Sequence, residues 1–155
     1  MDKIIIVKTL KELILRGDFG KARLLLSQCE KDSLETVLFE IGCDEENICA
    51  YAFVSCLIQC NENVEYHCLA SELLNIAFPH LKGAYQTSLY HLRRAIELDP
   101  SDLSLVEGLL FFYELPEKLI SEEEARNIVD EALKKNPESP IARSVFDDYF
   151  SKDTK

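Results

Sequence analysis

Three histidines are the first candidates for acid–base chemistry, because histidine is the side chain whose ordinary pKa lies nearest to neutrality. They are His67, His80 and His91. None lies in a recognisable catalytic motif, since the chain has no G-x-S-x-G, P-loop, HExxH or G-x-G-x-x-G pattern. His91 is followed by Arg93 and Arg94, which predicts a place on the polar face of a helix. We therefore expect a protein that is not an enzyme.

Six cysteines could form a disulfide scaffold, a metal site or part of a hydrophobic core. They are Cys29, Cys43, Cys49, Cys56, Cys60 and Cys68. No CxxC pair occurs, and Cys49, Cys56 and Cys60 are spaced along one stripe of a helix, which we expect to be buried. Zinc held by His67 and Cys68 is disfavoured, because neighbouring residues on a helix point about 100° apart. We expect reduced thiols, no metal and no cofactor.

Charge is distributed unevenly along the chain. The net charge is −11, from 17 Lys and Arg against 28 Asp and Glu. Residues 32–81, here called the acidic tract, contain no Lys or Arg. The carboxylates of the tract are Asp32, Glu35, Glu40, Asp44, Glu45, Glu46, Glu62, Glu65 and Glu72. Stacked helices would bring several of them onto one negative face, although solvated acids without a partner remain the alternative.

A negative face favours some partners over others. It repels nucleic acids and anionic membranes, whereas it attracts basic proteins and speeds their encounter. We therefore expect a basic protein partner, no nucleic acid and no membrane, and we leave self-association open. The candidate contact residues are Glu35, Glu40, Asp44, Glu45, Glu46, Glu62, Glu65, Glu72, Phe111 and Tyr113.

The two aromatic candidates come from the run LLFFYEL at residues 109–115, in which Glu114 is the only charged side chain. Such a run is too apolar for a helix that buries a single stripe. Either its apolar stripes are all buried between helices, or Phe111 or Tyr113 faces a partner or a second copy of the chain.

Hydrophobic periodicity predicts an all-α protein of about nine helices in a single helical domain, residues 1–155. The expected helices are 3–16, 18–30, 33–42, 46–60, 64–78, 82–98, 102–115, 121–135 and 138–150. Ser121 and Glu124 form an S-x-x-E capping box. Asp18 and Asp102 lie at other helix starts, and Pro140 suits a first turn. With no signal-peptide pattern and no apolar run of membrane-spanning length, we expect a cytoplasmic protein.

Several segments carry similar residues at matching positions. The matches are Gly17 with Gly83, Phe19 with Tyr85, Cys29 with Ala95 and Ala132, and Pro100 with Pro137. These positions resemble the second helix of the tetratricopeptide repeat. The resemblance covers 3–31 and 82–100, and 121–137 in part, whereas the Trp, Leu and Gly of the repeat's first helix are absent. It implies antiparallel helix pairs stacked as a short right-handed α-solenoid, with 138–150 as a C-terminal capping helix.

Proteins of this architecture bind peptides or domains, so the resemblance implies a protein-binding module. A small acidic helical protein without catalytic motifs also resembles, in type, the immunity proteins that bacteria make against their own toxins. Those toxins are often basic nucleases, which an acidic partner neutralises. The alternative is a peptide-binding regulatory adaptor or assembly chaperone, although the absence of Lys and Arg from the acidic tract disfavours capture of a carboxylate.

Overall fold

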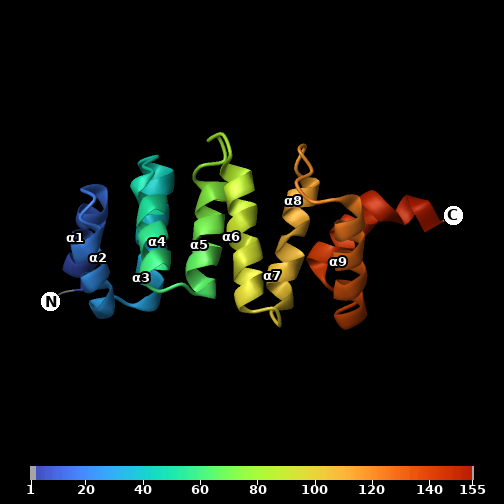
Figure 1. The fold of residues 1–155 in the computed structure, drawn as a ribbon, viewed down its shortest axis with the longest axis horizontal. Helices are drawn as coiled ribbons and strands as arrows, with labels where there is room; N and C mark the ends of the chain where they lie inside the picture. The colour runs from blue at the N-terminus through green and yellow to red at the C-terminus, as the bar shows by residue number, and fades with distance from the viewer. Residues whose placement is uncertain (1–2, 155) are drawn as a thin grey trace. The chain divides into compact units, whose positions relative to one another are not determined.

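The computed structural model describes residues 3–154, and all of their regular structure is helical, without a strand (Figure 1). The α-helices are α1 (Lys3–Leu15), α2 (Phe19–Leu25), α3 (Lys31–Phe39), α4 (Cys49–Cys60), α5 (Val64–Ile76), α6 (Ala84–Leu98), α7 (Leu103–Gly108), α8 (Leu110–Glu114), α9 (Glu122–Lys135) and α10 (Pro140–Val145). Shorter turns extend some of them: η1 (Leu26–Gln28), η2 (Glu40–Asp44), η3 (Phe146–Phe150) and η4 (Ser151–Thr154). The all-α prediction is confirmed.

Polar side chains begin several helices where the sequence predicts them. The Ser121 hydroxyl accepts from the Glu124 backbone N–H at 3.1 Å, and the Asp102 carboxylate accepts from the Ser104 N–H at 2.9 Å. Asp18 occupies the position before α2, but its carboxylate makes no capping hydrogen bond and instead pairs with Lys21 at 3.7 Å. The capping prediction is therefore confirmed for the two later helices and wrong for Asp18.

The chain divides into two compact units, of which one ends at His91 and the other begins at Leu92. In the N-terminal unit, α1 packs against α2, α3 and α4, and α4 packs along α5. The fully buried side chains between them include Leu10, Ile14, Leu38, Phe53 and Leu73. Buried residues recur every three or four positions, such as Ile6, Leu10 and Ile14 on α1 or Ala50, Phe53 and Leu57 on α4, so each helix turns one apolar stripe inward.

A glycine in η2 allows a close approach between two elements of the N-terminal unit. Gly42 is buried, and a Cβ atom built on it would lie 2.9 Å from the Cβ of Ala77 and 3.4 Å from a methyl group of Leu73. Real Cβ contacts are longer than this, so only glycine fits without a shift of the backbone. Gly42 thus lets the end of the α3 segment pack on the end of α5.

Serine side chains join α6 to α5. The hydroxyls of Ser71 and Ser88 lie 2.8 Å apart, and the Ser88 hydroxyl also donates to the backbone oxygen of Ser71 at 3.0 Å. Both serines are buried, and their small size lets the two backbones come close. In Figure 1, α4, α5 and α6 lie side by side.

The C-terminal unit buries most of the aromatic run. Leu109, Leu110 and Phe112 are buried, and so is Tyr113, whose side chain is only 5% exposed. The Tyr113 ring packs edge-on against Tyr149, at 5.2 Å between ring centroids. Leu109, Leu110, Phe112 and Tyr113 thus follow the buried alternative, whereas Phe111 is exposed and its contact with a partner stays a prediction.

Two of the glycines and two of the alanines that the sequence comparison matched with each other share local features in the structure. Gly17 and Gly83 adopt positive φ angles of 74° and 85°, which few other residues tolerate. Ala95 and Ala132 are buried, whereas Cys29 is only partly so.

Among the described helices, none combines the length and the apolar character that crossing a membrane requires.

The cysteines differ from the prediction of one buried stripe. Cys49 and Cys56 are partly exposed, and Cys60 is exposed near the end of α4. The buried stripe of α4 consists instead of Ala50, Phe53, Val54 and Leu57. Spacing alone could not distinguish the two stripes, because α4 is apolar around most of its circumference.

Candidate functional site

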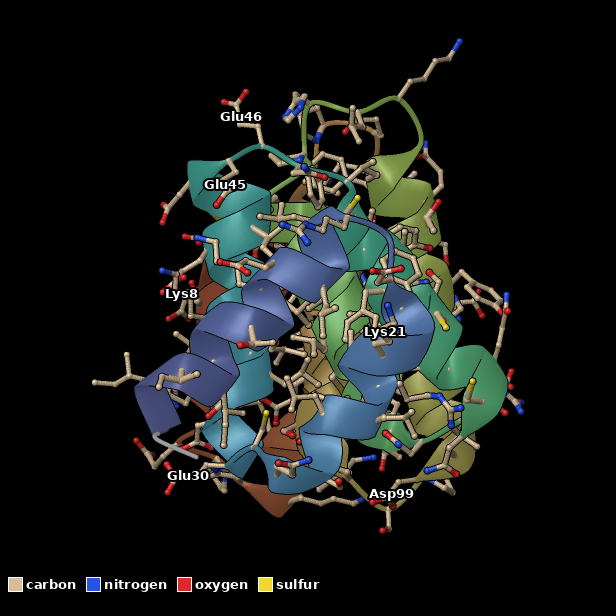
Figure 2. The ribbon with its side chains drawn as sticks, turned by 90° about the vertical axis from the view of Figure 1, so that its left-hand side faces the viewer. Lys8, Lys21, Glu30, Glu45, Glu46 and Asp99 are labelled. Atoms are coloured by element: carbon tan, nitrogen blue, oxygen red, sulfur yellow. The ribbon has the colours of Figure 1, made fainter. Side chains whose placement is uncertain are left out.

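The carboxylates of the acidic tract form separate groups rather than the single negative face that stacked helices would give. Lys11 on α1 pairs with Glu40 at 3.4 Å and with Glu45 at 2.8 Å, so these two acids face a cation from outside the tract. Figure 2 shows Glu45 and Glu46 at one end of the N-terminal unit and Glu30 at the other, with Lys8 and Lys21 on the helices between. The end that carries α1 and α2 therefore mixes both signs of charge.

A second group of carboxylates surrounds a cleft between α3 and α5. The cleft has a volume of about 470 Å³. Its lining residues are Asp32, Leu34, Glu35, Val64, Glu65, Tyr66, Cys68, Leu69 and Glu72. No Lys or Arg is among these described side chains, and apolar and aromatic side chains lie between the acids. We call this feature the acidic cleft.

Helical spacing explains why these four acids meet. Asp32 and Glu35 lie three residues apart at the start of α3, and Glu65 and Glu72 lie seven residues apart on α5. Both spacings return a side chain to the same face of a helix. Asp32 and Glu65 also lie in the first turns of their helices, where a negative charge is favoured by the helix dipole.

The start of α5 is fixed by a polar cap. The Asn63 side chain accepts a hydrogen bond from the backbone N–H of Tyr66 at 2.9 Å. This cap begins the helix at Val64, which places Glu65 and Tyr66 at the cleft. The position of the acidic wall of α5 therefore follows from local sequence.

Burial raises the pKa of Glu72, and the neighbouring negative charge of Glu35 raises it further. Partial desolvation and the like charge of Glu35 therefore disfavour the ionised form of Glu72 in the cleft. No group of three His, Cys, Asp or Glu side chains in the described part of the chain is arranged to hold a metal ion. The spread of the four acids suits several separated positive charges better than one cation.

Glu62 belongs to a different structure, a line of hydrogen bonds through the N-terminal unit. Its carboxylate lies 2.9 Å from Nε2 of His67, and Nδ1 of His67 lies 2.9 Å from Nδ1 of His91. Nε2 of His91 in turn lies 2.9 Å from the hydroxyl of Tyr51. We call these four residues the histidine cluster. It links α4, the turn before α5, α5 and α6.

His91 does not lie on a polar face, so that prediction is wrong. Its side chain is 5% exposed and His67 is 1% exposed, whereas Arg93 two residues later is exposed. The reason is angular: residues two apart on a helix point about 200° from each other, so they occupy opposite sides. Burial, and then the charge of His67, lower the pKa of His91 to about 4.

The two aromatic candidates of the C-terminal unit separate in the structure. Phe111 is 39% exposed, whereas Tyr113 is buried and therefore does not offer a contact surface. The Lys118 ammonium lies 3.8 Å from the centre of the Tyr113 ring, which further covers it. Of the pair, only Phe111 remains a candidate for contact with a partner.

Sequence reasoning missed the histidine cluster and did not include Asp32, which lines the acidic cleft, among the candidate contact residues. Asp32 was visible as the first acid of the tract, one helical turn before Glu35. His67 and His91 lie 24 residues apart on different helices, and no local pattern indicates that they meet.

Comparison with known proteins identifies no family for this chain. It matches no protein-family model, no curated protein and no solved structure at a significant level.

Proposed function

We propose that this chain is a non-enzymatic protein-binding module whose acidic cleft receives a basic segment of a partner protein. The observation that carries the proposal is the convergence of Asp32, Glu35, Glu65 and Glu72 on one cleft, in whose lining acids are the only charged side chains among those that the structure describes. A partner with several Lys or Arg residues would relieve the repulsion within the cleft and lower the raised pKa of Glu72.

The lining of the cleft also suggests the character of the segment. Leu34, Val64 and Leu69 lie between the carboxylates, so the complementary segment carries apolar side chains between its basic ones. The apolar contacts would set the dissociation rate, and the charges would set the association rate. Phe111 belongs to the C-terminal unit and not to the lining of the cleft, so its contact with a partner would be an additional one.

Two biological roles fit such a binding site. The first is that of an immunity protein, which would neutralise a basic toxin such as a nuclease in the cytoplasm. The second is that of a peptide-binding adaptor or assembly chaperone, which the shape of the site favours because a cleft accepts a segment more readily than a broad surface. In both roles we propose that the helices form antiparallel pairs of a short right-handed α-solenoid resembling tetratricopeptide repeats.

A charge-removing double variant tests the proposed binding site. Glu35→Gln/Glu72→Gln should weaken binding of a short lysine- and leucine-rich peptide roughly 3- to 10-fold, since each exposed charge contributes up to about 1 kcal/mol. Fluorescence anisotropy with labelled peptide measures the affinity. The fold should be preserved, because removing a carboxylate with a raised pKa relieves repulsion at neutral pH.

The matched control removes two carboxylates from the C-terminal unit. Glu117→Gln/Asp130→Asn changes the net charge by the same amount at exposed positions that are not in the lining of the acidic cleft. It should bind the peptide as the unaltered chain does. Equal weakening by both variants would show that the peptide responds to net charge alone, and the acidic cleft would not be the binding site.

A further inference from the structure

The histidine cluster is built from residues that the proposed binding function does not use. Tyr51 on α4, His67 on α5 and His91 on α6 come from three different helices, and Glu62 lies in the turn that precedes α5. Two buried imidazoles in direct hydrogen-bond contact are a costly arrangement unless every donor meets an acceptor. The cluster therefore constrains which protons it can hold.

With both rings neutral, one arrangement of hydrogens satisfies the whole cluster. His67 donates its Nε2–H to the Glu62 carboxylate, and its bare Nδ1 accepts the Nδ1–H of His91. The bare Nε2 of His91 then accepts the hydroxyl hydrogen of Tyr51. Each contact has one hydrogen and one lone pair, so the three helices are joined without a net charge on either ring.

The histidine cluster can take up one added proton with all its hydrogen bonds kept, but it cannot take up a second. A cationic His67 can donate through Nε2 to Glu62 and through Nδ1 to His91, while His91 donates its Nε2–H to the Tyr51 oxygen. If His91 also takes a proton, both Nδ1 atoms carry a hydrogen across a separation of 2.9 Å. Two N–H groups would then point at each other between two positive rings.

Few charges near His91 could offset that repulsion. The titratable groups that face it in the N-terminal unit are the Tyr51 hydroxyl from α4, the His67 ring from α5 and the neighbouring Tyr90 ring on α6. The carboxylate of Glu62 contacts His67 rather than His91, and it is 37% exposed to solvent. The nearest counter-charge thus stabilises the first proton and not the second.

We propose that the histidine cluster is an acid-sensitive lock, which holds α4, α5 and α6 together at neutral pH and opens when acidification places a proton on His91. Because α5 supplies Glu65 and Glu72 to the acidic cleft, opening of the lock also disturbs one wall of that cleft. Release of a bound basic partner in acid is the functional consequence. This consequence rests on the proposed function, whereas the lock itself does not.

Stability as a function of pH tests the lock. The pKa of His91 is about 4 in the folded chain, against about 6.5 in the unfolded chain, so the unfolded chain binds the proton more readily. The contribution of neutral His91 is complete above pH 6.5 and is lost as the pH falls towards 4. Between pH 7.5 and 4.5 the folding constant of the unaltered chain should fall on the order of 100-fold more than that of His91→Gln.

The third histidine provides the matched control. His80 is exposed and lies outside the cluster, so His80→Gln should keep the full pH dependence of the unaltered chain. Urea unfolding followed by circular dichroism at each pH gives the folding constants. Parallel pH profiles for the unaltered chain and His91→Gln would overturn the proposal.

A spectroscopic measurement decides the matter even if His91→Gln does not fold. Nitrogen-15 NMR of the unaltered chain at pH 7.5 should show neutral His91 with its hydrogen on Nδ1 and neutral His67 with its hydrogen on Nε2. On acidification, His91 should stay neutral until the pH approaches its pKa of about 4. A His91 that takes up its proton near pH 6.5, about the ordinary pKa of histidine, would contradict the lock.

Peptide binding separates the two proposals. If the lysine- and leucine-rich peptide binds at pH 7.5 and is released near pH 4.5 only while His91 is present, both proposals hold. If the pH profile and the NMR signature are found but the peptide never binds, the proposed function fails and the lock stands.

Discussion

At the scale of single residues, the structure depends on where polar groups find partners. His67 and His91 were sequence candidates because they are titratable, yet their role follows from contacts across three helices. Local pattern placed His91 beside two arginines and therefore on a polar face. The error arose because neighbours in sequence on a helix are not neighbours on its surface.

Tyrosine 51 gives a direct test at this scale. Tyr51→Phe removes the hydroxyl that lies 2.9 Å from Nε2 of His91 and leaves that buried nitrogen without its partner. We expect the free energy of unfolding at pH 7 to fall by about 1–3 kcal/mol, the usual cost of such an orphaned group. Urea unfolding measures it.

Tyr90→Phe is the control for Tyr51→Phe, because Tyr90 is 60% exposed and the same hydroxyl is removed. Its effect should lie within about 0.5 kcal/mol of zero. Equal losses in the two variants would mean that the Tyr51 hydroxyl contributes nothing special to the histidine cluster.

The thiols make a second residue-scale prediction, which follows from their unequal exposure. Cys43 and Cys60 are exposed, so they should react first with a thiol reagent in native buffer. Burial raises the pKa of Cys29, and burial followed by the proximity of Cys60 raises that of Cys56, so both hold less of the reactive thiolate. Mass spectrometry after timed labelling gives the order; early labelling of Cys29 would contradict it.

At the scale of elements, the sequence predicted the helices well and their packing less well. Each of the nine expected segments contains helix, because apolar periodicity and caps such as Ser121 are local signals. The short helices α7 and α8 were expected as one, and the π-helical turn η2 was not foreseen. The break between α7 and α8 and the turn η2 depend on packing partners that are distant in sequence. The pattern of neighbouring residues carries no information about those partners.

Gly42 shows how a contact between residues distant in sequence determines the packing of η2. Gly42→Ala should lower the free energy of unfolding by about 1–3 kcal/mol, because the new methyl group would meet Ala77 at 2.9 Å. Thermal or urea unfolding measures the change.

The control for Gly42→Ala is Gly20→Ala in α2, where an added Cβ meets no atom within 4 Å. Alanine is a better helix former than glycine, so this variant should leave stability unchanged or raise it by up to about 1 kcal/mol. If Gly20→Ala destabilised as much as Gly42→Ala, the close contact of η2 with α5 would not explain the loss.

At the scale of the whole molecule, charge was the most useful part of the sequence. The run of acids in residues 32–81 indicated that carboxylates would gather, and Asp32, Glu35, Glu65 and Glu72 do line one cleft. It did not indicate that Glu40 and Glu45 would pair with Lys11, a cation from outside the tract. Composition limits which charges a region can hold, whereas the fold decides which of them remain available to a partner.

The central claim is that the acidic cleft binds a basic segment, and NMR titration tests it most directly. Lysine- and leucine-rich peptide would be added to nitrogen-15-labelled protein at 0.1 M salt, where the screening length is about 10 Å, and at 1 M salt, where it is about 3 Å. We predict shifts of backbone resonances from Asp32 and Glu35 on α3 and from Glu65 to Glu72 on α5, much reduced at high salt. Shifts confined to other surfaces, or none at either salt concentration, would contradict the account.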